Sequence, residues 1–315
     1  MKNTAYNEFE NLFPDIIRKD VIMKDHTSIQ IGGPADLFCE VNSKDTLLKV
    51  LDAVKKLEIL AVLIGAGSNL LVDDKGFRGL IIKMISDDPP EYNDPFISAS
   101  SGNNLGDILR FAAERSLSGL EFLSGIPGTV GGAVYMNAGA YGNTISDILD
   151  KADILDEELQ EKTVNAKFFE FDYRYSVLQS RNCFVLSVDL RVNKGEKTDI
   201  LKEYNRIISI REIKHPDRSL PCAGSYFKNL PPEEEGEHRR AAGYFLDLAG
   251  AKKMKTGGAS VFEKHANIIV NCGNATSKDV LKLAEKMKEA VYNKFGIELE
   301  EEVRYLDSEK GIING

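Results

Sequence analysis

The segment at residues 124–142, SGIPGTVGGAVYMNAGAYG, constrains the fold of this chain more than any other stretch. Its density of glycine is too high for a regular helix or strand to form without cost, because glycine loses more backbone freedom on folding than any other residue. We therefore predict a loop whose backbone comes close to a ligand, with a set of tight structural turns as the alternative. The six glycines are Gly125, Gly128, Gly131, Gly132, Gly139 and Gly142.

A shorter glycine loop at residues 65–69 follows a buried strand predicted at 59–64. A dinucleotide fingerprint would need a third glycine and a following helix, and a P-loop would end in Gly-Lys-Ser/Thr. The dinucleotide fingerprint is disfavoured, because Leu70-Leu71-Val72 continues directly as a second strand, and the P-loop is ruled out, because Gly-Lys-Ser/Thr is absent from the end of the loop. The two glycine loops could present rows of backbone N–H groups to a pyrophosphate. For the shorter loop, a structural turn is an equally good interpretation.

The spacing of apolar residues predicts the other elements. Helices are expected after Ser43, at residues 105–112, at 201–208, and after a capping box at Thr276 and Asp279 that ends at Gly296. Strands are expected at residues 96–99, 168–175, 184–192 and 297–306. A domain boundary is expected near residues 194–200, where the character of the sequence changes.

Length and composition limit the functions that this chain can have. Its 315 residues are enough for two or three domains, and its net charge of -9 argues against a nucleic-acid-binding scaffold. We expect no membrane partner, because no apolar run approaches the roughly 20 residues of a membrane span. We also expect a cytoplasmic protein that acts as a monomer. The spacing of the four cysteines and four histidines predicts neither disulfides nor a metal site, so redox chemistry would need an organic cofactor.

Eight short motifs, in order along the chain, resemble those of the UDP-N-acetylenolpyruvoylglucosamine reductases of bacterial peptidoglycan synthesis. Each motif alone is weakly specific, whereas the ordered set is strongly so. The resemblance covers residues from about 25 to 306. The motifs lie at residues 29–33, 65–72, 125–132, 137–142, 173–176, 224–229, 264–267 and 299–304.

The resemblance implies an α+β fold with a two-subdomain FAD-binding module of the vanillyl-alcohol-oxidase/PCMH type and a separate α+β substrate-binding domain. On this basis we expect FAD-binding subdomains at residues 1–83 and 84–198, a substrate-binding domain at 199–298, and a C-terminal segment at 299–315 that returns to the active site. The implied reaction uses NADPH and FAD to reduce UDP-N-acetylglucosamine enolpyruvate, a small-molecule substrate, to UDP-N-acetylmuramate. Hydride passes from flavin N5 to C3 of the enolpyruvyl group, and a proton is added at C2.

The resemblance also implies roles for individual residues. Arg174 would hold the substrate carboxylate, Ser225 would donate the proton to C2, and Glu302 would assist formation of the enolate. Without the resemblance, the three would be interpreted as a strand-surface arginine, a turn serine and a solvated edge carboxylate. Arg211, Lys228 and Asn229 are the expected ligands of the UDP portion. FAD is expected to contact Gly65, Ala66, Gly67, Ser68, Asn69, Leu70, Gly125, Ile126, Pro127, Gly128, Thr129, Gly131, Gly132, Asn137, Gly139, Ala140 and Tyr173.

The basic stretch at residues 202–218 has a local net charge that suits a diphosphate, although an ordinary charged helix face explains it equally well. The chain also departs from the family pattern. The interval between Arg174 and Ser225 is that of the branch without an extra substrate-clamping tyrosine loop. Leu230 replaces a usual proline, and the insertion at residues 231–240 is longer than expected.

Two other functions stay open at this point. An oxidase of the wider vanillyl-alcohol-oxidase-like superfamily would use a similar FAD cradle, but such enzymes often tether FAD through a histidine, and neither glycine loop contains one. A regulator that binds a UDP-sugar or a flavin without redox activity would not need Arg174, Ser225 and Glu302, and all three are present.

Overall fold

The computed structural model describes residues 2–217, 219–234 and 238–313, and it divides into two compact units. Unit 1 consists of Met1–Ile17, Cys39–Ala66 and Ile82–Arg211, and unit 2 of Arg18–Phe38, Gly67–Ile81 and Glu212–Gly315. Neither unit is continuous in sequence. Their bounds therefore differ from those of the four segments expected from the sequence, which remain predictions about which part binds which ligand.

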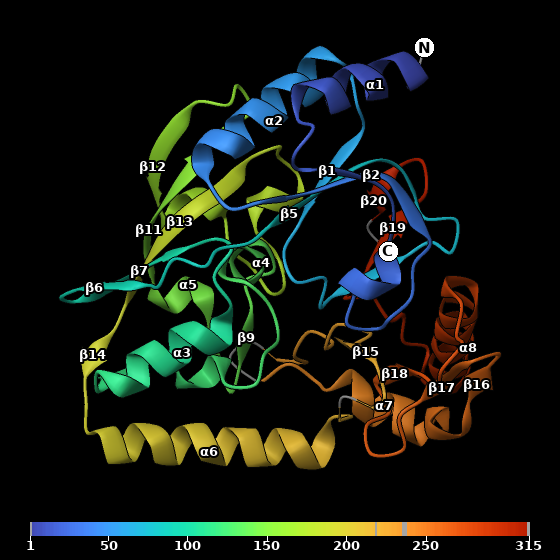
Figure 1. The fold of residues 1–315 in the computed structure, drawn as a ribbon. Helices are drawn as coiled ribbons and strands as arrows, with labels where there is room; N and C mark the ends of the chain where they lie inside the picture. The colour runs from blue at the N-terminus through green and yellow to red at the C-terminus, as the bar shows by residue number, and fades with distance from the viewer. Residues whose placement is uncertain (1, 218, 235–237, 314–315) are drawn as a thin grey trace. The chain divides into compact units, whose positions relative to one another are not determined.

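Unit 1 is built on an antiparallel five-stranded sheet of order β12-β11-β13-β7-β6. The helices α3, α4 and α5 pack on this sheet and share one apolar core with it (Figure 1). The strands are β6 (Glu91–Asn93), β7 (Phe96–Ser100), β11 (Leu149–Leu155), β12 (Glu161–Asn165) and β13 (Phe184–Arg191), and the helices are α3 (Leu105–Glu114), α4 (Val130–Tyr135) and α5 (Ile145–Ile148).

The rest of unit 1 is helices and short strand pairs. Ser43 caps α2 by accepting a hydrogen bond from the Thr46 N–H at 3.3 Å, as the sequence predicts. The elements are α1 (Lys2–Leu12), α2 (Lys44–Lys56), β3 (Ala61–Ile64), the pairs β8 (Leu117–Ser118) with β14 (Asn193–Lys194) and β9 (Gly139–Ala140) with β10 (Asn143–Thr144), and α6 (Lys197–Lys214), which ends beyond the unit boundary.

Two expectations fail in unit 1. The strand expected at residues 168–175 is instead a short 3-10 helix, η3 (Ala166–Phe169), and a turn. Phe169 is fully buried, and both Phe168 and Phe171 pack against the same core, so the adjacent residues 168 and 169 serve one core rather than the two faces of a sheet. In addition, the glycine-rich segment contains the helix α4, whose N-cap Thr129 accepts from the Gly132 N–H.

Unit 2 has a four-stranded sheet of order β15-β18-β17-β16 and a three-stranded sheet of order β20-β19-β4. Helices α7 and α8 complete its core (Figure 1). The elements are η1 (Met23–His26), β4 (Leu70–Val72), β15 (Cys222–Ser225), α7 (Ala242–Leu248), η5 (Ala251–Lys253), β16 (Lys255–Thr256), β17 (Ala259–Val261), β18 (Ile268–Asn271), α8 (Ser277–Phe295), β19 (Arg304–Asp307) and β20 (Gly311–Ile313).

The helix α8 confirms the predicted capping box. Thr276 accepts from the Asp279 N–H, Asp279 accepts from the Thr276 N–H, and Gly296 ends the helix with φ of 68°. The strand expected at residues 297–306 is only partly present, because β19 starts at Arg304 and the residues before it form a single bridge, Phe227 to Glu301.

A further sheet has the order β1-β2-β5-β3. Its strands β1 (Ile17–Ile22), β2 (Pro34–Val41) and β5 (Phe77–Met84) contain points at which the chain passes from one unit to the other.

None of the helices that the structure describes is long and apolar enough to cross a bilayer.

Candidate active site

The two predicted glycine loops touch each other within unit 1. A Cβ atom added at Gly65, in the first loop, would overlap the side chain of Thr129, in the second. Thr129 is 5% exposed and holds the start of α4. The close approach of the Thr129 side chain to the first loop therefore depends on glycine at position 65.

Not all amides of the long glycine segment can face a ligand. The Val130 N–H donates to the Asn103 carbonyl and the Gly131 N–H to the Ser101 carbonyl, both at 2.9 Å. The Gly132 N–H donates to Thr129 Oγ1. The expectation of a continuous row of amides facing a pyrophosphate is therefore wrong for these three. Here glycine serves close packing, because a Cβ at Gly131 would lie 3.0 Å from that of Ser101.

Two serine hydroxyls in this part of unit 1 are buried without a hydrogen-bond partner among the described residues. Ser124, which opens the long glycine segment, is fully buried, and Ser101, beside Gly131, is 3% exposed. A buried hydroxyl without a partner is unfavourable, and a bound ligand or an ordered water can supply the partner. With the tightly packed glycines, these hydroxyls fit a polar cofactor such as FAD.

Arg174 lies in a tight turn whose ends are tied to the glycine segment. Its φ of 55° is unusual for a residue with a side chain, and such strained conformations concentrate at functional sites. Its guanidinium donates to the Gly139 carbonyl at 3.0 Å and lies over the ring of Tyr173, 5.2 Å from the centroid. Asn137 donates to the Asp172 carbonyl at 3.1 Å. The structure thus brings together Asn137, Gly139, Tyr173 and Arg174, which the sequence could only group by motif.

Gln179 also holds the turn that contains Arg174. Its side-chain amide donates to the carbonyl oxygens of Arg174 and of Tyr135, the last residue of α4, both at 3.0 Å. Ser176 adds a second bond to the Tyr135 carbonyl at 2.8 Å. The backbone of Arg174 is therefore anchored to the helix that follows the glycine loop.

Arg211, an expected UDP ligand, lies on the long glycine segment. A Cβ atom added at Gly125 would be 2.8 Å from Arg211 Cδ, and both residues belong to unit 1. In the same basic stretch, Arg206 forms two hydrogen bonds with Glu203, which is the ordinary charged helix face that the sequence left open. Arg218 lies outside the described residues.

In unit 2, the segment that carries Ser225 pairs with the segment that carries Glu302. The Glu302 N–H donates to the Tyr226 carbonyl at 2.7 Å, and the Lys228 N–H donates to the Glu300 carbonyl at 2.8 Å. Glu302 therefore makes this hydrogen bond with its own N–H, and Ser225 is the residue next to the acceptor Tyr226.

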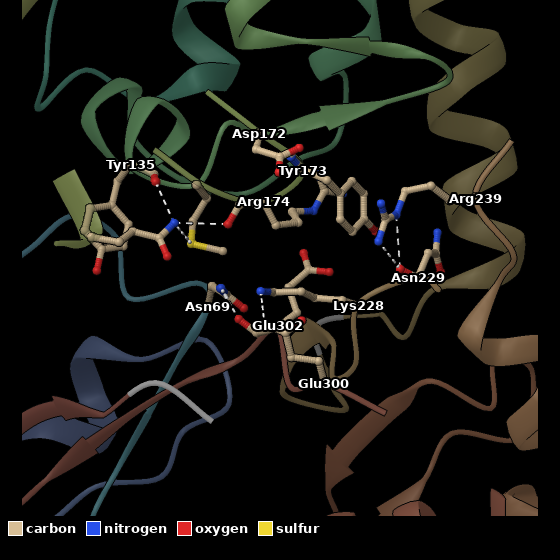
Figure 2. Close-up of polar contacts among 12 residues, drawn as sticks. Asn69, Tyr135, Asp172, Tyr173, Arg174, Lys228, Asn229, Arg239, Glu300 and Glu302 are labelled. Atoms are coloured by element: carbon tan, nitrogen blue, oxygen red, sulfur yellow. Dashed lines mark hydrogen bonds and ion pairs between the residues drawn. The ribbon is translucent and has the colours of Figure 1, made fainter. Parts of the chain in front are cut away.

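Asn69, predicted as a FAD ligand, also binds the C-terminal segment. Its side-chain amide donates to the Glu302 carbonyl at 3.0 Å, and its own carbonyl accepts from the Arg304 N–H at 3.0 Å (Figure 2). The first glycine loop continues as β4, which pairs in parallel with β19. The backbone of Glu302 is thus held on its N–H side by Tyr226 and on its carbonyl side by Asn69.

The expected substrate ligands Lys228 and Asn229 both have partners in unit 2. Lys228 forms an ion pair with Glu300. The Asn229 side-chain oxygen accepts from the Ala242 N–H at the start of α7, and its carbonyl accepts from Arg239 at 2.8 Å (Figure 2). Arg239 belongs to the 231–240 insertion, whose two ends are joined by a bridge between Leu230 and Arg240; residues 235–237 of the insertion lie outside the described residues.

Sequence reasoning did not identify Glu301. Its carboxylate accepts from the Tyr226 hydroxyl at 3.5 Å and lies 3.9 Å from Lys288 Nζ on α8. Burial raises the pKa of the Glu301 carboxyl, and burial next to Glu301 raises the pKa of the Tyr226 hydroxyl as well. Strand alternation already places residue 301 on the face opposite to 300 and 302, and this was the only signal available in the sequence.

No group of three or more potential metal ligands exists among residues 2–217, 219–234 and 238–313. A surface pocket beside α2, lined by residues such as Leu48, Asp52 and Gln160, contains none of the predicted site residues.

The comparisons with known proteins agree with this geometry. Residues 35–158 match the family model of an FAD binding domain, and residues 215–306 match that of the UDP-N-acetylenolpyruvoylglucosamine reductase C-terminal domain. The chain is 40% identical over 289 residues to the UDP-N-acetylenolpyruvoylglucosamine reductase of Anoxybacillus flavithermus, which covers 91% of this chain and 93% of the relative. For the Bacillus subtilis reductase the identity is 38% over 286 residues, with 90% and 92% covered.

A solved structure gives the same result. The crystal structure of the reductase of the same name from Thermus caldophilus superposes with a TM-score of 0.77 at 31% identity, covering 92% of this chain and 99% of that one. Together with the two family matches, this confirms the predicted α+β fold, with an FAD-binding module and a separate α+β domain.

Proposed function

Since this chain belongs to the family of UDP-N-acetylenolpyruvoylglucosamine reductases, we propose that it reduces UDP-N-acetylglucosamine enolpyruvate to UDP-N-acetylmuramate with NADPH as the reductant. It is an FAD-dependent oxidoreductase of peptidoglycan precursor synthesis. The observation that supports the proposal most directly is the pairing of the Ser225 and Glu302 segments in unit 2. In this role the protein acts on a small molecule in the cytoplasm, as a monomer.

FAD would be held by both glycine loops. In unit 1 the proposed contacts include Gly65, Gly125 and Thr129, with the buried hydroxyls of Ser101 and Ser124 nearby in the fold. When bound, FAD would supply the two-electron hydride chemistry between NADPH and C3 of the enolpyruvyl group. The protein itself must hold the substrate carboxylate, stabilise the charge that develops beside it, and add one proton at C2.

Three side chains are proposed for these tasks. The guanidinium of Arg174 can grip a carboxylate with two parallel hydrogen bonds, and its backbone is anchored for this by Gln179. The Ser225 hydroxyl donates the proton to C2; as a weak acid, it depends on neighbours that stabilise the alkoxide. Glu302 assists formation of the enolate, and its backbone is held on both sides by Tyr226 and Asn69.

The UDP portion is proposed to bind Arg211, Lys228 and Asn229. Lys228 is the cation of this set in unit 2, and its side chain is 21% exposed beside Glu300. Because Glu300 is largely exposed, a diphosphate can replace it as the partner of Lys228 at little cost.

The test separates the two halves of the reaction by stopped-flow measurement of flavin absorbance. In wild-type protein, NADPH should bleach the flavin, and the enolpyruvyl UDP-sugar should restore its colour. Ser225→Ala and Glu302→Gln should leave bleaching unchanged and slow the sugar-dependent recovery by about 100-fold or more, which is the usual contribution of a general acid or base. Glu298→Gln, an exposed carboxylate on the same segment, is the matched control and should behave as wild type.

Recovery at the wild-type rate in both variants would contradict the assigned roles. A wild-type protein that cannot be loaded with FAD, or whose reduced flavin does not react with the sugar, would contradict the proposed function itself.

A further inference from the structure

Asn267 is a buried asparagine that holds the backbone directly after Ser225. Its side-chain oxygen accepts from the Phe227 N–H at 2.9 Å, and its side-chain nitrogen donates to the Phe227 carbonyl at 2.8 Å. Its own carbonyl accepts from the Tyr226 N–H at 2.8 Å. Asn267 is 2% exposed, so these bonds are shielded from water and costly to lose.

These bonds hold the chain beyond the end of β15, which stops pairing with β18 at Ser225. The strands β15 and β18 pair Cys222 with Val270 and Ser225 with Ile268, with an irregularity between the two pairs. Gly224 lies in this irregularity with φ of +79°, and apart from its chain neighbours no described atom comes within 4 Å of the position of its missing Cβ. A side chain at position 224 therefore does not help to fix the turn, and Ser225 is held by its pairing with Ile268 and by the bonds of the two residues that follow it.

The same peptide also connects to the second proposed catalytic residue of unit 2. The Tyr226 carbonyl accepts from the Glu302 N–H at 2.7 Å and from the Val303 N–H at 3.4 Å. The residue pair 226–227 is thus bound by Asn267 on one side and by the Glu302 segment on the other. A shift of this pair would move Ser225 relative to Glu302.

We propose that Asn267 is a positioning residue that sets the placement of Ser225 relative to Glu302 for the proton-transfer half of the reaction. This inference rests on the proposed function. It assigns to Asn267 a role in the rate of one half-reaction, in addition to the stability that any buried, hydrogen-bonded amide provides.

Asn271, the last residue of β18, offers a matched control four residues after Asn267. It is also buried, at 5% exposure, and it also forms several hydrogen bonds with backbone groups of unit 2. Its side chain donates to the Ile29 carbonyl and accepts from the N–H groups of Gly273 and Ala275, so it does not touch the Ser225 segment. Alanine at either position removes a buried amide, but only the amide of Asn267 holds the backbone that directly follows Ser225.

The experiment compares Asn267→Ala and Asn271→Ala in the FAD-loaded full-length protein. Both should lower the unfolding temperature, and both should be reduced by NADPH at the wild-type rate. At saturating sugar, only Asn267→Ala should slow the recovery of the flavin, by about 100-fold, since a misplacement of about 1 Å has an effect of that order. Equal recovery rates in the two variants would overturn the inference.

Asn267→Asp provides a second readout that does not depend on the alanine variant folding. Aspartate keeps the shape and the acceptor for the Phe227 N–H, but when ionised its other oxygen faces the Phe227 carbonyl and repels it. When protonated, this oxygen donates as the amide does, and burial favours that form. The ratio of the Asn267→Asp recovery rate to the wild-type rate should therefore rise as the pH is lowered, and a ratio independent of pH would overturn the inference.

The outcomes separate this inference from the proposed function. If the reduced wild-type flavin does not react with the sugar, both are overturned. If the reduced wild-type flavin reacts with the sugar, and both variants at position 267 react at the wild-type rate at every pH, only the role of Asn267 is overturned.

Discussion

Replacing Gly67 by alanine tests whether the first glycine loop needs a backbone that only glycine can provide. Gly67 has φ of +65°, and an added Cβ would overlap the carbonyl oxygen of His26 and lie 3.3 Å from Thr27 Cα. The left-handed conformation alone costs about 1–2 kcal/mol for alanine. Displacing the His26 carbonyl also endangers the hydrogen bond from the Ser28 N–H to the Gly67 carbonyl, worth about 1 kcal/mol. We therefore expect Gly67→Ala to lower the free energy of unfolding by at least about 2 kcal/mol.

The matched control is Gly296→Ala, also in unit 2. Gly296 has nearly the same φ, +68°, but no described atom lies within 4 Å of its missing Cβ. This variant should therefore show only the cost of the left-handed conformation, about 1–2 kcal/mol. Urea unfolding followed by circular dichroism measures both, and FAD titration should show weaker binding only for Gly67→Ala. If Gly67→Ala is no less stable than Gly296→Ala, the overlap with His26 is not a determinant of the loop.

Three other changes test separate parts of the structure. Arg174→Lys removes the two-point guanidinium, so recovery of the reduced flavin by the sugar should slow by about 100-fold while reduction by NADPH is unchanged, as stopped-flow absorbance would show; equal slowing of both halves would contradict the role. Because burial raises the pKa of Glu301, its carboxyl favours the folded state at low pH, and this contribution is lost as the pH rises through that pKa. In urea unfolding at a series of pH values, Glu301→Gln should show a smaller fall in the free energy of unfolding as the pH rises. A fall as large as that of the wild type would contradict the role of Glu301. Thr276→Ala removes the cap of α8 and should lower the free energy of unfolding by about 1 kcal/mol, measured in the same way, and no change would count against the capping box.

Elements with strong local signals could be predicted from the sequence. The helices α2 and α8 carry their own caps, Ser43 and Thr276, and their apolar spacing needs no knowledge of the rest of the fold. The prediction failed at residues 168–175, because alternating aromatic residues suit both a strand and a buried turn, and only the packing of the adjacent residues Phe168 and Phe169 on one core decides between them. It failed in the glycine segment because the packing of α4 against Ser101 outweighs the low helix propensity of glycine.

The site shows the same limit more clearly. Ordered motifs identified Arg174, Ser225 and Glu302 as candidates, because each lies within a short local pattern. The contacts that hold these residues join positions far apart in the chain, such as Asn69 with Glu302 and Asn267 with Phe227. Periodicity within a single segment carries no information about such pairs. The sequence therefore identifies Asn267 only as part of the motif at residues 264–267 and predicts no role for it.

The neighbouring carboxylates Glu301 and Glu302 show how the fold can separate stability from chemistry over one peptide bond. The Glu301 side chain faces Tyr226 and Lys288 in the interior of unit 2, where burial raises its pKa. The backbone of Glu302 is held by Tyr226 on one side and by Asn69 on the other. Glutamine at position 301 should therefore change the pH dependence of stability and leave sugar-dependent flavin recovery intact, whereas glutamine at position 302 should slow that recovery. Slowed recovery in the Glu301→Gln variant would contradict this separation.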